Sequence, residues 1–273
     1  MKLVDSLQRA QAMGLARIDA QLLHLFALNR APHERAWLIA HDTDELSAST
    51  LARLAPLLLR RAAGEPLAYI TGVKEFFGLP LQVDARVLDP RPDTEILVEW
   101  ALELLPTNTV WRVADLGTGS GAIALAVQHA RPQAEVSAVD ASAEALSVAR
   151  ANAERLGLPL RCIQSDWLRQ VPGCFDLIVS NPPYIAQNDP HLAALTHEPL
   201  QALASGPDGL DDIRNLIAQA PDHLQPGGWL LLEHGHDQAE TVRRLFTQAG
   251  GWQAVQSRRD LAGIERCTGA QRG

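Results

Sequence analysis

The sequence has few cysteines and no long apolar run. Its 273 residues include three cysteines, scattered along the second half of the chain: Cys162, Cys174 and Cys267. This number and spacing exclude a disulfide scaffold and a paired zinc site, so we expect reduced thiols that fill small apolar spaces. No apolar run approaches the roughly 20 residues that span a bilayer, and no basic start joins an apolar core as in a signal peptide. We therefore expect a cytoplasmic protein with no membrane partner.

The sequence also lacks an excess of positive charge. Its 24 Lys and Arg stand against 32 Asp and Glu, for a formal net charge of −8. Divided at Val73, the chain has eight basic against seven acidic residues before that point, and hence 16 against 25 from it onward. Proteins that bind duplex nucleic acid through many phosphate contacts usually show a basic excess. The charge therefore argues against a direct nucleic-acid partner, although a local basic patch is compatible with an acidic total.

The first quarter of the chain has a helical pattern. Apolar residues recur at helical spacing in residues 18–29 and 49–64. Residues that stop or cap helices stand near these stretches: Gly14 and Gly64 as stops, Asp5 and Ser47 as N-caps. A small helical domain over residues 1–73 fits this pattern.

The composition changes near residue 73. Residues 74–92 contain short β-like runs that glycine and proline interrupt, which is typical of a hairpin followed by a linker. The 47% of hydrophobic residues is enough to build a core in each of two domains. We therefore expect a hairpin and linker over 74–92 and a second domain over 93–273.

Strand and helix patterns alternate in this second domain. The alternation predicts a parallel sheet with helices on both faces. Residues 177–179 are apolar throughout, as expected of a strand that is buried on both sides. The expected strands are 109–117, 134–140, 160–166 and 175–181, the expected helices are 121–130 and 143–157, and residues 209–269 continue the alternation.

A glycine-rich segment lies where the first of these strands is followed by a helix. Three glycines in five residues let the backbone turn tightly and approach a ligand closely. The spacing lacks the Lys-Ser/Thr of a P-loop and is shorter than the dinucleotide pattern Gly-x-Gly-x-x-Gly, so pyrophosphate binding is disfavoured. Because such loops also occur as plain turns, this motif alone leaves the question of a ligand open. The segment consists of Asp115, Leu116, Gly117, Thr118, Gly119, Ser120 and Gly121.

Acidic residues follow the next two expected strands. Asp140 lies about 20 residues past the glycines, where a carboxylate can accept hydrogen bonds from both hydroxyls of a ribose. It could equally serve with Ser142 as a helix N-cap. Asp166 and Trp167 follow the third strand, where a carboxylate could accept from an adenine amino group and an indole could cover the ring. A lone tryptophan is more often simply part of a core.

The most specific signal follows the fourth expected strand, and it consists of Asn181, Pro182, Pro183 and Tyr184. The two prolines remove two N–H donors and leave an acceptor-rich loop. An amide nitrogen is a poor nucleophile because its lone pair is delocalised. The Asn181 side-chain oxygen and the Pro182 carbonyl could each accept one N–H of such a group, and Tyr184 could cover it. An Asn-Pro turn at a strand end is the plain alternative.

No metal site is expected. His234 and His236 flank Gly235 after a strand and have no third ligand nearby, so a structural or surface role is favoured. Arg60 and Arg61 end an expected helix, where cations suit the helix dipole.

These segments, in this order, resemble the HemK/PrmC family of protein-glutamine N5-methyltransferases. The resemblance covers nearly the whole chain, and its more discriminating parts are the blocks around the shared methyltransferase motifs: RRAAGEPLAYITGVKEFFGLPL, VLDPRPDTEILVEW, EPLQALASGPDGL and DLAGIERCTG. It implies an α/β fold, with a Rossmann-like seven-stranded class I methyltransferase domain preceded by a small all-α N-terminal domain and a β-hairpin linker. One departure is Asp89, where many members have an apolar residue, so we assign no catalytic role to that segment.

The resemblance also implies a reaction. The protein would transfer a methyl group from S-adenosyl-L-methionine to the glutamine of the Gly-Gly-Gln motif in class I peptide-chain release factors, and S-adenosyl-L-homocysteine would be the product. The sulfonium methyl group is already activated, so no metal is required. Asn181, Pro182, Pro183 and Tyr184 would hold the glutamine. The methyl donor would bind Asp115, Gly117, Thr118, Gly119, Ser120, Gly121, Asp140, Asp166, Trp167 and Asn181.

Three other functions remain open at this point. Glutamine methylation of a ribosomal protein would use the same loop with a different N-terminal docking domain. Adenine-N6 methylation of nucleic acid should show a target-recognition domain or a basic cleft, and the acidic charge of this chain argues against both. A non-catalytic binding module is the third, and the intact Asn181-Pro182-Pro183-Tyr184 motif argues against it. The sequence leaves open whether Arg91, Asp93 or Glu95 contacts substrate.

Overall fold

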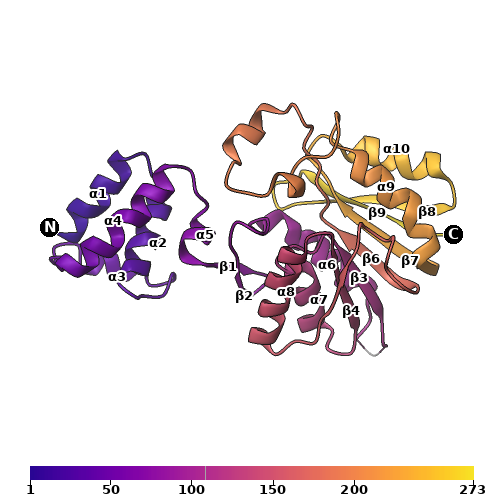
Figure 1. Ribbon diagram of the computed structural model, residues 1–273, viewed down its shortest axis with the longest axis horizontal. Coiled ribbons are helices and arrows are strands. Elements are labelled where there is room, and N and C mark those ends of the chain that lie inside the picture. Colours follow the sequence, from indigo (N-terminus) through magenta and orange to yellow (C-terminus); the bar gives the residue numbers. More distant parts are fainter. Residues whose placement is uncertain (108) are drawn as a thin grey trace. The chain divides into compact units, whose positions relative to one another are not determined.

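The chain folds into a helical unit, Met1–Val73, and an α/β unit, Lys74–Gly273. The computed structural model describes residues 1–107 and 109–273. Each unit has hydrophobic clusters of its own, so each is described by itself. Figure 1 shows helices alone in the first unit and a sheet flanked by helices in the second.

Leucines at helical spacing form the core of the first unit. Leu23 and Leu25 of the second helix and Leu54 of the fourth are almost completely buried. The five helices are α1 (Leu3–Ala12), α2 (Arg17–Ala27), α3 (Arg35–Ala40), α4 (Ala48–Ala62) and α5 (Leu67–Thr71).

The helix ends in this unit follow the predicted stop signals and one of the two predicted caps. Gly14 and Gly64 follow α1 and α4 with φ of 92° and 93°. Ser47 caps α4, because its hydroxyl accepts a hydrogen bond of 3.1 Å from the Thr50 N–H. The prediction for Asp5 is wrong: α1 already begins at Leu3, so Asp5 lies inside its first turn. An acid there still favours the helix dipole.

A hairpin begins the second part of the chain, as predicted. It pairs β1 (Val73–Phe76) with β2 (Leu79–Gln82). The two turn residues, Phe77 and Gly78, have φ of 50° and 78°. Two consecutive positive φ values give the turn whose twist matches that of paired strands.

A seven-stranded sheet forms the centre of the α/β unit, in the order β5-β4-β3-β6-β7-β9-β8. Five neighbouring strands, from β5 to β7, are parallel, but β9 is antiparallel to both of its neighbours. The expectation of a wholly parallel sheet is therefore wrong at this edge, because a short turn joins β8 to β9 and a short connection pairs strands antiparallel. The strands are β3 (Arg112–Leu116), β4 (Glu135–Asp140), β5 (Arg161–Gln164), β6 (Phe175–Ser180), β7 (Leu224–Glu233), β8 (Trp252–Arg259) and β9 (Glu265–Arg272).

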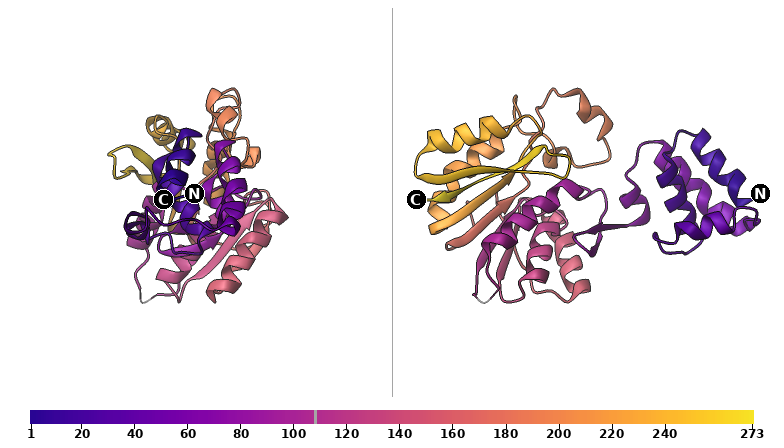
Figure 2. Two further views of the ribbon diagram at one scale, coloured as in Figure 1. Left: turned by 90° about the vertical axis from the view of Figure 1, so that its left-hand side faces the viewer. Right: turned by 180° about the vertical axis from the view of Figure 1, so that it is seen from behind.

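Helices cover both faces of this sheet, which confirms the predicted fold class (Figures 1 and 2). Alternate side chains of one strand serve the two faces: Val113 of β3 belongs to one apolar cluster and Ala114 to the other. The first cluster contains side chains of α6 (Glu95–Leu104), α7 (Ala122–Ala130) and α8 (Ala143–Leu156). The second contains side chains of α9 (Asp211–Gln219) and α10 (Ala239–Ala249).

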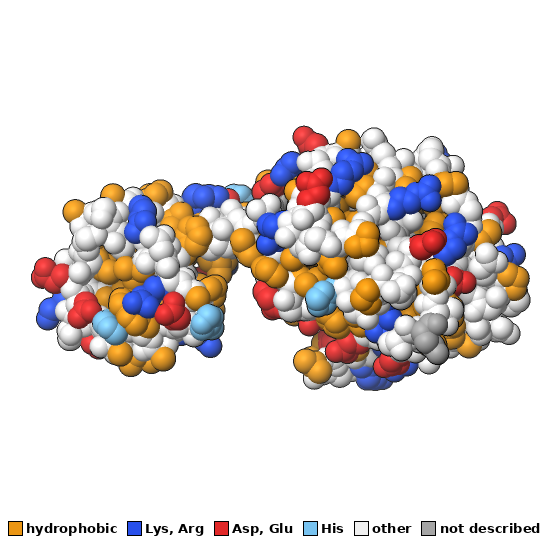
Figure 3. Space-filling model, turned by 90° about the horizontal axis from the view of Figure 1, so that it is seen from below, with side chains coloured by type: hydrophobic (Ala, Val, Ile, Leu, Met, Phe, Trp, Pro, Cys, Tyr) orange, Lys and Arg blue, Asp and Glu red, His pale blue; other side chains and the backbone are white. Residues whose placement is uncertain are grey.

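Charged side chains of both signs are interspersed on the face drawn in Figure 3, where Lys and Arg form no continuous stripe over either unit. None of the helices in the described part of the chain combines the length and apolar composition that a bilayer crossing requires. All three cysteines are free thiols, and Cys267 is buried.

Candidate active site

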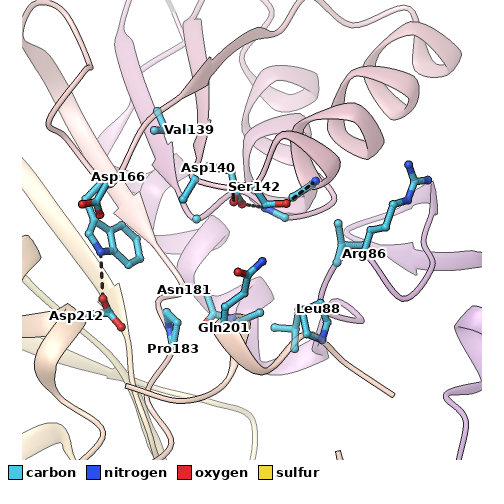
Figure 4. A pocket seen from close by; sticks show the side chains of 18 of the residues that line it. Arg86, Leu88, Val139, Asp140, Ser142, Asp166, Asn181, Pro183, Gln201 and Asp212 are labelled. Atoms are coloured by element: carbon cyan, nitrogen blue, oxygen red, sulfur yellow. Dashed lines mark hydrogen bonds between the residues drawn. The ribbon is translucent and has the colours of Figure 1, made fainter. Parts of the chain in front are cut away.

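A cavity of about 240 Å³ lies at the carboxyl ends of the parallel strands. The strand order reverses between β3 and β6, and open α/β sheets bind ligands at such a switch point. In Figure 4, Asp140 and Ser142 lie on one side, Asp166 and Asp212 at one end, and Arg86 and Leu88 at the other. The cavity is lined by Arg86, Val87, Leu88, Gly117, Gly119, Val139, Asp140, Ala141, Ser142, Ala145, Ser165, Asp166, Trp167, Asn181, Pro183, Pro199, Gln201, Ala202 and Asp212.

The glycine loop forms one wall of this cavity. Gly117, Gly119 and Gly121 have φ of 69°, 54° and 83°, a conformation that favours glycine. Gly117 and Gly119 line the cavity, and a Cβ atom at Gly119 would meet no protein atom within 4 Å. Gly121 instead packs against α7 and α8, since a Cβ there would approach the Leu125 Cδ1 atom to 3.1 Å. Gly119 therefore leaves room for a ligand, Gly117 leaves room for the indole of Trp167, and Gly121 leaves room for helix packing.

Asp115 lies beneath the loop rather than in the cavity wall. It is buried, and its Oδ2 accepts hydrogen bonds from the Thr118 hydroxyl at 2.6 Å and the Ala124 N–H at 3.1 Å. Burial raises the pKa of Asp115 to about 7 against the opposing effect of these hydrogen bonds. Thr118 and Ser120 are buried as well, and neither lines the cavity. The Asp115 carboxyl thus ties the loop, through Thr118, to the start of α7 at Ala124.

Asp140 lies at the end of β4 and faces the cavity. Its Oδ2 accepts a hydrogen bond of 3.0 Å from the Gly119 N–H, and its Oδ1 accepts one of 2.9 Å from the Ser142 N–H. Burial raises the pKa of this carboxyl. The cap of α8 is Ser142, whose hydroxyl accepts from the Ala145 N–H, so Asp140 is not the helix cap. Each carboxylate oxygen keeps a further lone pair that can face a ligand.

Trp167 and Asp166 follow β5 and also line the cavity. Trp167 has a φ of 50°, and its indole N–H donates a hydrogen bond of 3.0 Å to Oδ1 of Asp212 (Figure 4). The indole also lies next to the glycine loop, because a Cβ at Gly117 would be 3.4 Å from its Cζ3 atom. Asp166 is half exposed and forms a 3.0 Å ion pair with Arg169. The indole is thus a fixed apolar surface rather than a fully buried core side chain.

Some side chains of the segment after β6 face the cavity, and others pack into the core. Asn181 and Pro183 line the cavity, whereas Pro182 and Tyr184 are absent from its lining. The Asn181 Nδ2 group donates a hydrogen bond of 3.2 Å to Oγ1 of Thr94. Tyr184 packs against the apolar cluster beneath, and its hydroxyl donates to Oε1 of Glu233 at 3.4 Å. Burial raises the pKa of Tyr184, followed by the effect of the Glu233 charge.

We assigned no role to several lining residues from the sequence, although Leu88 and Gln201 stand in segments that carry the family resemblance. Arg86 and Leu88 come from the segment after β2, and Gln201 comes from residues 185–205. Asp212 stands in the first turn of α9. Acidic residues are common at helix starts, so nothing in the sequence indicated another role for Asp212. No signal in the sequence indicates that these positions reach the cavity.

The segment that contains Asp89 has a structural role. Glu198 accepts from the Arg91 guanidinium at 2.6 Å and from the Asp89 N–H at 3.1 Å. Asp93 forms an ion pair of 3.3 Å with Arg266. Glu95 accepts a hydrogen bond of 3.0 Å from the Phe77 N–H. These three side chains, of Arg91, Asp93 and Glu95, therefore connect elements around the cavity. None of the three is part of its lining.

Histidines and acids form no metal-binding cluster of three or more in the described residues. His234 is buried and bonds to the Thr268 hydroxyl at 2.8 Å and to the Gly235 carbonyl at 2.9 Å. Its neighbour His236 is exposed. The two side chains thus have different surroundings, as expected of a structural histidine and a surface one.

The cavity fits an adenosine-like ligand. It offers glycine backbone without Cβ atoms, the Asp140 carboxylate beside it, and the indole of Trp167. Asn181 lies in the same cavity and brings a side-chain amide to it. This combination suits a bound adenosyl group next to a second, amide-bearing group.

Two domain families match the chain. The methyltransferase small domain matches residues 93–250, and the PrmC N-terminal domain matches residues 3–72. Curated relatives match almost end to end. Release factor glutamine methyltransferases from Bordetella pertussis and Coxiella burnetii are 51% and 46% identical, over 94% of this chain and 95% and 92% of theirs. The one from Escherichia coli is 43% identical over 97% of this chain and 95% of its own.

Solved structures share the fold at lower identity. A methyltransferase from Pyrococcus furiosus has a TM-score of 0.57 at 21% identity and covers 82% of this chain and 99% of its own. A Thermus thermophilus 16S rRNA methyltransferase in complex with AdoMet and guanosine has a TM-score of 0.54 at 20% identity, over 74% of this chain and 50% of its own. With its class I fold, its cavity at the switch point of the sheet and relatives of near-equal length, the chain belongs to the release factor glutamine methyltransferase family and is an S-adenosylmethionine-dependent methyltransferase.

Proposed function

We propose that this protein transfers a methyl group from S-adenosyl-L-methionine to the side-chain amide nitrogen of the glutamine in the Gly-Gly-Gln motif of class I peptide-chain release factors. The observation that carries this proposal is the presence of Asn181 in the same cavity as Gly117, Gly119 and Asp140. The relatives that match almost the whole chain carry the name release factor glutamine methyltransferase, which supports this choice of substrate.

Four elements of the cavity would hold the methyl donor. The glycine loop lets the donor approach the backbone, and Asp140 accepts from the ribose hydroxyls. Trp167 covers the adenine ring, and Asp166 accepts from its amino group. Asp115, Thr118 and Gly121 keep the loop in shape from below, and the Ser120 carbonyl accepts a hydrogen bond from Asn152. When bound, the donor supplies a sulfonium-activated methyl group.

The segment Asn181 to Tyr184 would hold the substrate amide. The Asn181 side-chain oxygen and the Pro182 carbonyl each accept one N–H of the glutamine, so the nitrogen lone pair turns towards the methyl group. Pro183 lines the cavity beside Asn181. Tyr184, which packs into the core, supports this corner from behind. The amide proton that methylation makes acidic leaves to these acceptors or to water.

The helical unit Met1–Val73 would engage the release factor. The match of the PrmC N-terminal domain to residues 3–72 supports this role. Two exposed apolar side chains of the unit, Ile18 and Ile39, line one open hollow, where a partner protein could bury them. Because release factors act on ribosomes, the protein would work in the cytoplasm.

Methyl transfer from a labelled donor tests the proposal. The protein is incubated with methyl-labelled S-adenosyl-L-methionine and, separately, with a class I release factor, ribosomal proteins and DNA. We expect label in the release factor, and none when the glutamine of its Gly-Gly-Gln motif is replaced by alanine. Label in ribosomal protein or DNA, with none in the release factor, contradicts the proposal. The Asn181→Ala protein serves as the inactive control.

A further inference from the structure

The cavity has one wall of strand ends and one wall that lies outside the seven-stranded sheet. The first contains Gly119, which follows β3, and Asp140, which ends β4. The second contains Leu88, from the stretch between β2 and α6, and Gln201, from residues 185–205. In Figure 4, Leu88 and Gln201 lie across the cavity from Asp140. Strand pairing therefore holds the first wall in place, but not the second.

Residues 185–205 form a loop whose two ends are bonded to each other. The Ile185 N–H donates to the Leu203 carbonyl, and the Ser205 N–H donates to the Ile185 carbonyl, both at 2.9 Å. Near its end the loop contains the short 3-10 helix η3 (Leu200–Ala202). Figure 1 shows this loop in orange, extending away from the sheet. The position of η3 at the cavity therefore depends on contacts beyond the base of the loop.

Glu198 makes such a contact with both of its carboxylate oxygens. Its Oε2 accepts a hydrogen bond from the Arg91 guanidinium at 2.6 Å, and its Oε1 accepts one from the Asp89 N–H at 3.1 Å. The Glu198 side chain is 2% exposed, so it has little access to water that could replace either partner. Because an unpaired carboxylate is costly to bury, this contact holds the loop against the stretch before α6.

Two further ion pairs fix the partners of Glu198. Asp89 pairs with Lys74 at 3.3 Å and with Arg91 at 3.6 Å. The network of two cations and two anions has no formal net charge. Loss of any one member therefore leaves a partly buried charge without its partner.

This contact lies directly behind the cavity lining on both sides. Leu88 precedes Asp89 in the chain, Pro199 follows Glu198, and both Leu88 and Pro199 line the cavity. Pro199 also begins η3 with a φ of −63°, which its ring restricts, so a shift of Glu198 is passed on to η3. Residues 107 and 109 positions apart thus determine how closely the two lining stretches approach.

We propose that Glu198 and Arg91 are positioning residues, which hold residues 199–202 against residues 86–88 and so keep this wall of the cavity closed over the methyl donor. Neither side chain lines the cavity, so both act through the lining residues beside them. The assignment rests on the proposed site of the methyl donor, and not on which protein is methylated.

Arg91 offers a matched pair of variants. Arg91→Lys keeps the positive charge and can still donate to Glu198, whereas Arg91→Met keeps an unbranched side chain and does neither. A ligand that binds only the closed wall loses affinity in proportion to the fraction of closed protein. We expect the dissociation constant of S-adenosyl-L-homocysteine to rise roughly 10-fold in Arg91→Met and less than about threefold in Arg91→Lys. Equal affinities of these two variants would contradict the proposal.

Glu198→Gln tests the other partner without leaving a buried charge on the loop. A glutamine has one acceptor oxygen, so its NH2 group must face either the Arg91 guanidinium or the Asp89 N–H, and both of these groups are donors. We expect a loss of affinity similar to that of Arg91→Met. In the Arg91→Met background, Glu198→Gln should cost less than about threefold further, because the two side chains act as a unit. Full additivity shows that Glu198 acts by another route, and overturns the proposal.

Glu265→Gln is the control for the loss of an ion pair elsewhere in the same unit. Glu265 of β9 pairs with Arg243 of α10 at 3.1 Å, and neither residue lines the cavity. This variant should leave the affinity for S-adenosyl-L-homocysteine unchanged, while urea denaturation reports any loss of overall stability. A loss of affinity as large as that of Glu198→Gln would show that the effect is not specific to the contact behind the cavity, and would refute the positioning role.

The Asp89 amide gives a readout that needs neither methyl donor nor methyl acceptor. Its N–H is bonded to Glu198, so its hydrogen exchange in the free protein reports how often this contact opens. We expect exchange at least about 10-fold faster in Arg91→Met and Glu198→Gln, and unchanged in Glu265→Gln.

The exchange result separates this proposal from the proposed substrate. Unchanged exchange in Arg91→Met and Glu198→Gln overturns the positioning role, whatever the protein methylates. If exchange is faster and binding of S-adenosyl-L-homocysteine is weaker in these variants, but the wild type methylates no release factor, the positioning role is supported and the proposed substrate is refuted.

Discussion

The indole N–H of Trp167 donates a hydrogen bond of 3.0 Å to Oδ1 of Asp212. This contact joins residues 45 positions apart, from the segment after β5 and from the first turn of α9, and both line the cavity. It holds the indole in a fixed orientation next to the glycine loop, where the proposed adenine site lies. Asp212 is therefore the support of the surface that would cover the adenine ring.

Removal of this support should weaken donor binding. For Asp212→Ala we expect an affinity for S-adenosyl-L-homocysteine about threefold to tenfold lower, the equivalent of losing one ordinary hydrogen bond. Isothermal titration calorimetry measures the affinity. Asp211→Ala is the control, since Asp211 lies in the same turn but pairs with Arg214 on the surface and is absent from the cavity lining. Equal affinities of the two variants would contradict this role of Asp212.

A side chain in place of Gly119 should weaken ligand binding more than it destabilises the fold. Gly119 and Gly157 both have positive φ, 54° and 66°, and a Cβ atom at either would meet no protein atom within 4 Å. Alanine at each should therefore destabilise the fold similarly, by about 1 to 2 kcal/mol. Gly119 lines the cavity and Gly157 ends α8 away from it.

Binding should then separate these two variants. We expect Gly119→Ala to lower the affinity for S-adenosyl-L-homocysteine at least about tenfold, since the new methyl group occupies ligand space, and Gly157→Ala to leave it unchanged. Chemical denaturation and calorimetry on both proteins check the prediction. Unaltered binding by Gly119→Ala would mean that the donor does not approach this part of the loop.

Asn181→Ala should lose most turnover and keep the fold. Its side chain contributes one hydrogen bond to the protein, with Thr94, and otherwise faces the cavity. We expect kcat to fall by about 100-fold or more, as for loss of an oriented polar group in a transition state, with a melting temperature close to that of the wild type. Single-turnover transfer of labelled methyl and a thermal melt measure the two quantities. Unchanged transfer by a folded Asn181→Ala protein refutes the proposed role.

The buried Glu233 should make the protein less stable as pH rises. Burial raises its pKa from 4.5 to about 7, with Asp93 raising it and Arg266 lowering it to a smaller extent. The folded state then binds more protons than the unfolded state between these values, so the free energy of unfolding falls as pH rises from about 4.5 to about 7. The difference of about 2.5 pKa units corresponds to roughly 3 kcal/mol.

Urea denaturation across this pH range measures the slope. The Glu233→Gln protein cannot titrate at this position. Its free energy of unfolding should therefore fall by up to roughly 3 kcal/mol less over this pH range than that of the wild type. At pH 8 its stability should be no lower than that of the wild type. Asp115, whose pKa burial also raises to about 7, contributes a slope of the same sign in both proteins. Identical slopes in the two proteins would show that Glu233 does not retain its proton on folding.

The local pattern of the chain was enough to predict the fold class and which motif residues gather at one edge of the sheet. Strand and helix spacing, the glycine segment and the acids at strand ends are short-range features, and parallel strands bring their carboxyl ends to one edge of the sheet. Gly117, Asp140, Trp167 and Asn181 therefore had to lie near one another once the strand order was right, and all four line the cavity. The Ser47 cap is a similar case, because it depends on the next three residues only.

The tertiary structure alone decided which side chains of each motif reach the cavity and which residues support them. Asp115 and Tyr184 belong to the recognised motifs but point into the protein, because burial depends on what packs against them. Thr94 becomes the hydrogen-bond partner of Asn181 only because the start of α6 lies beside the end of β6. The antiparallel direction of β9 was likewise decided by its pairing with β7 and β8. A sequence pattern fixes the period of an element, whereas contacts across many residues depend on the strand order and the packing that the whole chain adopts.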